Sequence, residues 1–221
     1  MVARTTRPRP AETPTALANL EPMLLCEVPR PFNREGWGFE LKYDGWRCLA
    51  EVRDRQTRLH TRRGNDATRW WEEVARGLAQ LEGHHILDGE VCVLDEYGRS
   101  DFERLQARSL LKDWKPDADM VVYCVFDLLV YNGQDIMRQP LQRRKADLAD
   151  LLSPMSDAVL RVGYIPSEGQ WLFERALELH LEGIVAKDLS STYQPGVRSR
   201  HWLKIKRPGA VPPERFHFGS R

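Results

Sequence analysis

Lysine is scarce in this chain, and the few lysines lie where chemistry could take place. Of the 33 basic residues only seven are lysines, and four of these occupy short apolar stretches: Lys42, Lys187, Lys204 and Lys206. An arginine guanidinium stays protonated, whereas a lysine amine can lose its proton and act as a nucleophile. The four lysines are therefore candidates for covalent or phosphate-binding chemistry, with ordinary solvated strand ends as the alternative.

Residues 42–47, with the sequence KYDGWR, show the clearest pattern. Asp44-Gly45 is typical of a tight turn between two strands, so we expect a hairpin across which the Lys42 and Arg47 side chains converge. Taken alone, the hexapeptide is also compatible with an ordinary hairpin with flanking charges, because short motifs arise by chance.

Three later segments place carboxylates or lysines beside apolar runs. Asp88-Gly89-Glu90 precedes one such run, and residues 182–187 have the same form. Lys204 and Lys206 alternate with apolar residues, so both ammonium groups fall on one face of a strand. An edge strand with a solvated lysine face would give the same pattern.

Together these segments resemble, in order and approximate spacing, the nucleotidyltransferase motifs of ATP-dependent DNA ligases, a superfamily that includes RNA ligases and mRNA capping enzymes. Residues 42–47 match the KxDGxR nucleophile motif. The later matches are Asp88-Gly89-Glu90, the aromatic motif Phe126-Asp127-Leu128-Leu129, residues 182–187 and residues 202–206.

Two further stretches narrow the resemblance, which covers about residues 20–208. Residues 61–64 (TRRG) look like the SRNG-type segment of DNA ligases, and residues 191–206 look like the SxYxPGxRSxxWLKxK run of bacterial end-joining ligase modules. The aromatic motif, followed by Tyr131-Asn132-Gly133, has a DNA-ligase form. An RNA-ligase or capping-type nucleotidyltransferase is therefore the weaker chemical alternative.

The resemblance implies a role for each matching residue. Lys42 would form a covalent lysyl-AMP, and Lys204 and Lys206 would assist by neutralising phosphate charge and lowering the pKa of Lys42. Phe126 would stack on adenine. The implied nucleotide-binding set is Glu40 and Leu41 (partly through their backbone), Lys42, Arg47, Arg62, Glu90 (at the ribose), Phe126, Glu182, Lys204 and Lys206.

The implied cofactors are ATP and a divalent cation, Mg²⁺ or Mn²⁺. Glu182 would bind the metal, with Glu90 as a second candidate ligand. Mg²⁺ is commonly held by one or two carboxylates together with phosphate oxygens and water, which suits so small a set. The histidines and cysteines show no zinc-ligand spacing.

Basic residues gather just after the first motif. Six arginines fall within residues 53–69, opposed only by Asp54 and Asp66: Arg53, Arg55, Arg58, Arg62, Arg63 and Arg69. A local basic patch in a nearly neutral chain predicts contact with duplex DNA phosphates, with Arg47, Arg62 and Arg63 as the expected DNA-binding residues. A solvated strand face is the alternative.

The apolar pattern predicts a mixed, largely antiparallel α+β fold, because adjacent strands are interrupted irregularly by helices. Strands are expected within residues 38–63 and at about 85–94, 120–130, 184–188 and 202–206. Helices are expected from Asn65-Asp66 through residue 81, after Ser100-Asp101, from Pro140, and from a Ser167/Gln170 capping box to Gly183. Trp70, Trp71 and Trp171 are expected in the core.

Composition sets the remaining limits. With 42% apolar residues in 221 and a net charge of +1, the chain is neither disordered nor a polycation. Its longest apolar run, residues 120–126, is far below the roughly 18 residues that span a bilayer, so no membrane is expected. Four cysteines without a CxxC pair favour a reducing location, such as the bacterial cytosol or nucleoid.

We expect three regions: a mobile tail over residues 1–18, an adenylation domain over 19–208, and a C-terminal tail over 209–221. The last is too short for the OB-fold domain that follows in the family. Nicked or broken duplex DNA is the expected substrate, and an OB-fold or end-joining protein is an expected partner for efficient sealing. A non-catalytic DNA- or partner-binding module is the other functional alternative.

Overall fold

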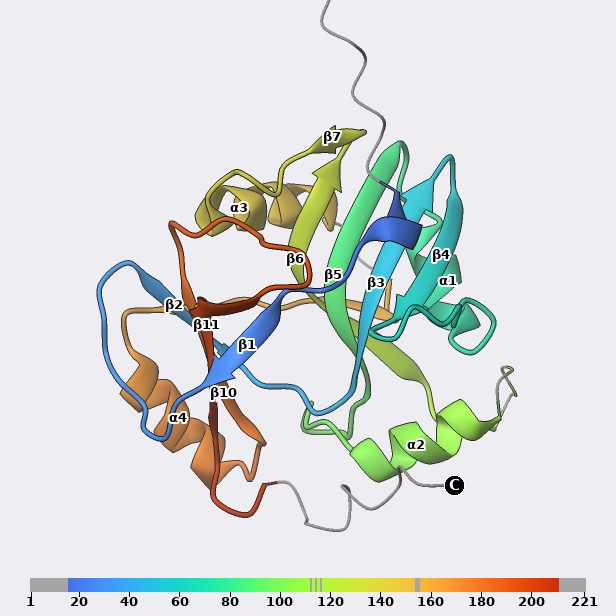
Figure 1. The fold of residues 1–221 in the computed structure, drawn as a ribbon. Coiled ribbons are helices and arrows are strands. Elements are labelled where there is room, and N and C mark those ends of the chain that lie inside the picture. Colours follow the sequence, from blue (N-terminus) through green and yellow to red (C-terminus); the bar gives the residue numbers. More distant parts are fainter. Residues whose placement is uncertain (1–15, 112, 114, 116, 154–155, 211–221) are drawn as a thin grey trace, which may run out of the picture.

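The computed structural model describes residues 16–111, 113, 115, 117–153 and 156–210, in which two sheets face each other (Figure 1). The first sheet has the order β1-β11-β10-β2-β9, and the second has the order β4-β3-β5-β6-β7, with β8 beside β6. The strands are β1 (Leu24–Glu27), β2 (Trp37–Leu41), β3 (Trp46–Arg53), β4 (Gln56–Thr61), β5 (His84–Val93), β6 (Val121–Tyr131), β7 (Gln134–Asp135), β8 (Val159–Arg161), β9 (Ile165–Pro166), β10 (Gly183–Asp188) and β11 (Arg198–Lys206).

Most strand pairs are antiparallel, as predicted; β1–β11 and β6–β8 are parallel. Four α-helices occur in the described residues, together with a short 3₁₀ helix over Leu17–Asn19: α1 (Glu72–Leu78), α2 (Phe102–Leu110), α3 (Leu141–Leu151) and α4 (Gly169–Glu178). The predicted mixed α+β class is therefore confirmed.

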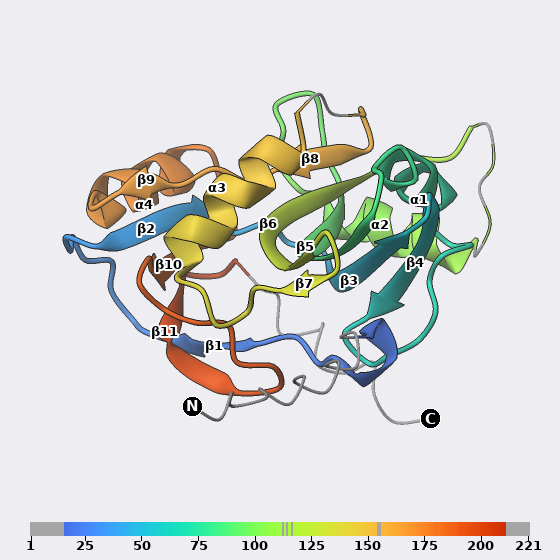
Figure 2. The ribbon, with the colours of Figure 1, turned by 90° about the horizontal axis from the view of Figure 1, so that it is seen from above.

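The helices cover the outer faces of the two sheets. One apolar core lies under α1 and α3, a second lies under α4, and a third lies between the sheets. Apolar residues of α1 and α3 pack on the second sheet, and Leu172 and Ala176 of α4 pack on the first. Between the sheets, Leu49 and Ile86 meet Trp202. Figure 2 shows α3 along β6, where it also reaches the first sheet. No helix in the described part of the chain has the length and apolar character to cross a membrane.

The predicted helix at residue 65 begins later than expected. Asp66 does accept a local backbone hydrogen bond, from Thr68 N at 2.9 Å, but it closes a turn, and α1 starts at Glu72. Trp71 is fully buried and packs edge-to-face with Trp46 and Trp70. The core interpretation is therefore confirmed for Trp71, whereas Trp70 is half-buried and packs against the same core.

The fourth helix departs from two predictions. The Ser167/Gln170 capping box does not form, because Ser167 has a left-handed φ of 65° and Asn33 Oδ1 accepts the hydrogen bond from Gln170 N. The helix also ends at Glu178, before the predicted stop at Gly183. Trp171 is 50% exposed rather than in the core, since α4 turns Leu172 toward the sheet instead.

Candidate active site

The motif at residues 42–47 connects the two sheets and is not a hairpin, which corrects the sequence-based expectation. Strand β2 pairs with β10 and β9, whereas β3 pairs with β4 and β5. Gly45 is required in this crossing, because a Cβ there would lie 2.2 Å from the Val91 carbonyl oxygen. Lys42 and Arg47 nevertheless converge, since both line one cavity at the junction of the sheets.

That cavity brings together six predicted nucleotide-binding residues: Glu40, Leu41, Lys42, Arg47, Glu90 and Phe126. Five further residues complete its lining: Leu25, Tyr43, Val185, Lys187 and Trp202. Glu182 touches the same centre through its contact with Lys42. Arg62, Lys204 and Lys206 lie outside this lining.

Lys42 and Glu182 form a direct ion pair at the centre. Lys42 Nζ donates a 2.6 Å hydrogen bond to Glu182 Oε2, and both side chains are largely buried. Burial alone would lower the pKa of the Lys42 amine, but Glu182, Glu90 and Asp44 outweigh it and raise that pKa. The expected lowering of this pKa by Lys204 and Lys206 is therefore not observed.

Glu90 is a second carboxylate of the cavity, and its side chain has no hydrogen-bond partner among the described residues. Burial raises its pKa to about 7, against the opposing effect of Lys42 and Arg47. No side-chain hydrogen bond to it occurs within the described residues, whereas Asp88, two positions earlier on β5, is fully bonded. Glu90 is thus available to a ligand.

Arg47 is anchored by Asp88 and also lines the cavity. Its Nε donates to Asp88 Oδ1 at 2.5 Å and its Nη2 donates to Asp88 Oδ2 at 2.6 Å. Tyr193 Oη donates to the same Oδ2 at 2.7 Å and accepts a bond from Met23 N at 2.9 Å. The guanidinium carbon lies 4.5 Å from the centre of the Phe126 ring.

Lys187 and Lys145, to which the sequence assigned no role, both contact the carboxylate of Glu40. Lys187 Nζ lies 2.7 Å from Glu40 Oε2, and Lys145 of α3 contacts the other Glu40 oxygen. Lys187 also lies 4.1 Å from the ring centres of both Phe126 and Trp202. Burial lowers the pKa of Lys187 to about 8. The scarcity of lysine pointed to Lys187 without a role; no sequence signal pointed to Lys145.

Lys204 and Lys206 share one carboxylate at the edge of the first sheet. Glu27 Oε2 lies 3.1 Å from Lys204 Nζ and 3.7 Å from Lys206 Nζ. Both lysines lie on the cavity side of β11, because they alternate with buried Ile205 and share a face with Trp202.

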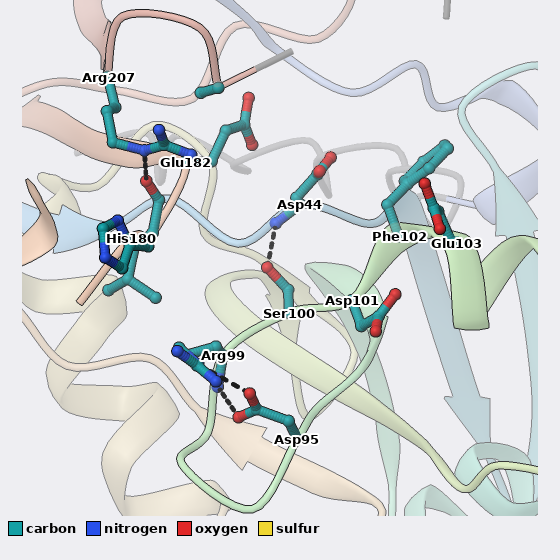
Figure 3. Close-up of a pocket in the computed structure, with 12 residues that line it drawn as sticks. Asp44, Asp95, Arg99, Ser100, Asp101, Phe102, Glu103, His180, Glu182 and Arg207 are labelled. Atoms are coloured by element: carbon teal, nitrogen blue, oxygen red, sulfur yellow. Dashed lines mark hydrogen bonds and ion pairs between the residues drawn. The ribbon is translucent and has the colours of Figure 1, made fainter. Parts of the chain in front are cut away.

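A second, wider hollow begins at Glu182 and Asp44, outside the junction (Figure 3). Asp44 N donates a 2.9 Å hydrogen bond to Ser100 Oγ, which ties the first motif to the loop before α2. Arg207, just after β11, donates from Nε to Leu181 O at 3.0 Å. The Lys42–Glu182 contact therefore separates two openings.

The predicted arginine patch is exposed but divides into two groups. Arg53, Arg55 and Arg69 contact acidic residues: Glu51, Glu82 and Asp113, respectively. Arg58, Arg62 and Arg63 are exposed and have no ion pair within the described residues. The last three are thus the ones free to meet an external anion.

The donor set fits a hard divalent cation. Glu182 and Glu90 offer carboxylate oxygens, which Mg²⁺ prefers, and Glu90 has unused hydrogen-bonding capacity. In the described residues no group of three or more histidine, cysteine, aspartate or glutamate side chains could hold a metal. Phosphate and water oxygens would have to complete the coordination.

Two facing, largely antiparallel sheets with a lysine, carboxylates and an aromatic ring at their junction define a nucleotidyltransferase fold and site. This chain belongs to the ATP-dependent DNA ligase family, because the family model for the ATP dependent DNA ligase domain matches residues 22–206. It is an adenylation domain of this family.

Curated relatives agree with this assignment. The chain is 37% identical over 186 residues to the SPbeta prophage-derived DNA ligase-like protein LigB of Bacillus subtilis, covering 84% of this chain and 67% of LigB. It is 35% identical over 189 residues to the multifunctional non-homologous end joining protein LigD of Pseudomonas aeruginosa, covering 85% of this chain and 22% of LigD.

Solved structures share the fold. A mycobacterial DNA ligase D complexed with ATP and MES superposes with a TM-score of 0.75 at 30% identity, covering 87% of this chain and 62% of that chain. The Chlorella virus DNA ligase-adenylate, at 20% identity and a TM-score of 0.62, covers 85% of this chain and 67% of that chain and supports the fold alone.

Proposed function

We propose that Lys42 is the nucleophile of a self-adenylation reaction. Its amine attacks the α-phosphorus of ATP, a P–N bond forms, and the bond to the β-phosphate oxygen breaks, which releases pyrophosphate. The observation that carries this proposal is the Lys42–Glu182 contact of 2.6 Å at the mouth of a cavity that contains Phe126 and Glu90. A DNA 5′-phosphate would then take the AMP from Lys42.

The amine must be neutral to attack, so its ion pair with Glu182 has to be released. A divalent cation held by Glu182 and Glu90 would supply positive charge against the triphosphate. Glu182→Gln should lower the pKa of Lys42, because it removes the largest of the charges that raise it. The acid limb of the adenylation rate should then move to lower pH, and the Mg²⁺ or Mn²⁺ concentration needed for half-maximal rate should rise.

The base of the nucleotide is proposed to meet Glu40 and Lys187 as well as Phe126. A carboxylate acceptor beside an ammonium donor complements adenine, whose N6 donates and N1 accepts; guanine presents the opposite pair. The expected contacts from the Glu40 and Leu41 backbone remain a further prediction. Lys187→Met should lower the ratio of the labelling rate with ATP to the labelling rate with GTP. If this ratio is unchanged, Lys187 does not take part in base recognition.

Duplex DNA with a 5′-phosphate at a nick or break is the proposed acceptor of AMP. The relatives named as DNA ligases and end-joining proteins support this, as do exposed Arg58, Arg62 and Arg63. We propose that these arginines contact one side of a duplex and that efficient joining uses an OB-fold or end-joining partner on the other side. Four free cysteines favour a reducing bacterial cytosol or nucleoid.

The experiment that tests this function compares ATP labelled at the α-phosphate with ATP labelled at the γ-phosphate. Label should remain on the denatured protein only from the α-position, and nicked duplex carrying a 5′-phosphate should remove it. A duplex with a 5′-hydroxyl is the matched control. Retention of γ-label would contradict adenylation, and removal of label by the 5′-hydroxyl duplex would contradict the proposed acceptor.

A further inference from the structure

Glu27 is placed by an unusual strand pairing. It is the last residue of β1, and the parallel pairing of β1 with β11 aligns it with Lys204. Its Oε2 lies 3.1 Å from Lys204 Nζ and 3.7 Å from Lys206 Nζ, so one carboxylate oxygen lies beside two ammonium groups. A terminal phosphate oxygen would occupy such a position equally well.

The same face of this sheet carries Lys42. Lys206 is aligned with Gly183 of β10, and the Gly183 carbonyl accepts a 3.0 Å hydrogen bond from Lys42 N. Neighbouring strands lie about 4.8 Å apart, so Lys206 is roughly 10 Å from Lys42 across the sheet and Glu27 lies one strand further out. Gly183 contributes no side chain to the gap between the two lysines.

Charges therefore alternate along this face. Lys42 contacts Glu182, Lys206 lies close enough to Glu182 to act on it electrostatically, and Glu27 contacts Lys206 and Lys204. A triphosphate whose α-phosphate meets Lys42 would extend its β- and γ-phosphates along the row toward Glu27. The carboxylate of Glu27 and those phosphates would compete for the same two lysines.

We propose that Glu27 is an internal counter-anion that competes with the terminal phosphates of ATP, and with pyrophosphate, for Lys204 and Lys206. This inference rests on the proposed function of the site. Glu27 holds the two ammonium groups in place before ATP binds, and its return to them favours departure of pyrophosphate. It is a positioning residue, because it acts on the phosphates through the lysines.

The environment of Glu27 supports an electrostatic rather than a structural role. Its side chain is 56% exposed, and those of Lys204 and Lys206 are 25% and 27% exposed, so a substitution leaves no buried charge without a partner. The lysines hold the pKa of Glu27 below its ordinary value through hydrogen bonding and charge. Glu27 is their ion-pair partner within the described residues.

The direct test is a calorimetric titration of the 221-residue protein with inorganic pyrophosphate. Glu27→Gln should bind it about three- to tenfold more tightly than the wild type, the range expected when one exposed competing charge is removed. Glu21→Gln is the matched control, because it removes the same charge from an exposed residue just before β1. It should bind as the wild type does, and all variants should melt at similar temperatures.

A variant that lacks both lysines shows whether Glu27 acts through their charges or through a change elsewhere in the structure. In Lys204→Ala/Lys206→Ala protein the additional Glu27→Gln change should give no gain, and in the parent the gain should shrink at high salt. Unchanged or weaker pyrophosphate binding by Glu27→Gln, equal gain by Glu21→Gln, or no binding by any protein would each overturn the proposal. Because the titration involves no transfer of AMP, it is independent of whether Lys42 is the nucleophile.

Discussion

Arg47 lies opposite Glu90 in the β3–β5 register, yet its guanidinium binds Asp88 through two hydrogen bonds of 2.5 and 2.6 Å. The strand register would allow either carboxylate to take the arginine. Because Asp88 takes it, and Tyr193 binds Asp88 as well, Glu90 stays open toward the cavity. The two carboxylates of this motif therefore have different roles: Asp88 anchors Arg47, and Glu90 faces the cavity.

Asp88→Asn should destabilise the fold by about 3 kcal/mol, because it leaves the buried Arg47 without its counter-charge. Urea unfolding followed by tryptophan fluorescence would measure the change. Glu178→Gln, which removes one partner of the exposed Arg175 pair, is the control and should cost less than about 0.5 kcal/mol. Equal losses in the two variants would show that the Arg47–Asp88 pair is not a structural anchor.

Glu90→Gln should change the pH dependence of stability. The pKa of this carboxyl is about 7 in the folded protein, against an ordinary value of 4.5 for a glutamate in water. Between these values the folded protein keeps a proton that the unfolded chain has lost, so this group's contribution to stability falls as the pH rises and is lost above about 7.

From pH 4.5 to pH 8 the stability difference between Glu90→Gln and the wild type should therefore shift by about 1–2 kcal/mol in favour of the variant. The expected shift is smaller than the free energy that corresponds to the whole difference between the two pKa values, because the carboxyl is partly exposed to solvent. Urea titrations at the two pH values measure it. A difference that does not vary with pH would mean that Glu90 is already ionised at pH 5.

Lys204→Ala and Lys206→Ala should each lower the rate of self-adenylation by roughly tenfold or more, with a smaller change in the ATP concentration for half-maximal rate. The reason is that phosphate charge shifts onto the leaving pyrophosphate in the transition state, where these ammonium groups act. Single-turnover labelling at several ATP concentrations separates the two effects. A change confined to the concentration dependence would make them binding residues only.

Arg62→Ala/Arg63→Ala should weaken binding to nicked duplex and reduce the salt dependence, with the slope of log K against log salt falling by about one for each phosphate that is no longer bound. Fluorescence anisotropy at several salt concentrations measures this slope. Arg55→Ala is the control, because that guanidinium already contacts Glu82. A uniform loss at constant slope would point to a local structural effect instead.

The sequence predicted most strands and the contents of the site, because apolar alternation and motif spacing are local properties. Strands β5 and β6 and helix α2, with Asp101 as its N-cap, lie close to their expected positions. Pairing is not local. Strand β2 finds its partner about 140 residues downstream in β10, and no pattern at residues 42–47 distinguishes that arrangement from a hairpin.

The residues that the sequence did not reveal contact partners that are far away along the chain. Lys145 reaches Glu40 from another element, and Glu27 reaches two lysines through a parallel strand pair, so neither belongs to a recognisable motif. Aromatic character alone does not predict burial. Trp171 lies one position from the apolar stripe of α4 and is at the surface. Such placements depend on packing between elements.

The intact mass of the protein after incubation with ATP and Mg²⁺ tests the central claim most directly. We expect a gain of one adenylyl group in the wild type, with the modified peptide mapping to Lys42. We expect no gain in Lys42→Ala or in Lys42→Arg, because neither an alanine methyl group nor a guanidinium can act as a neutral amine nucleophile at ordinary pH. An adenylyl group found on either variant, or mapped in the wild type to another residue, would contradict the assignment of Lys42 as the nucleophile.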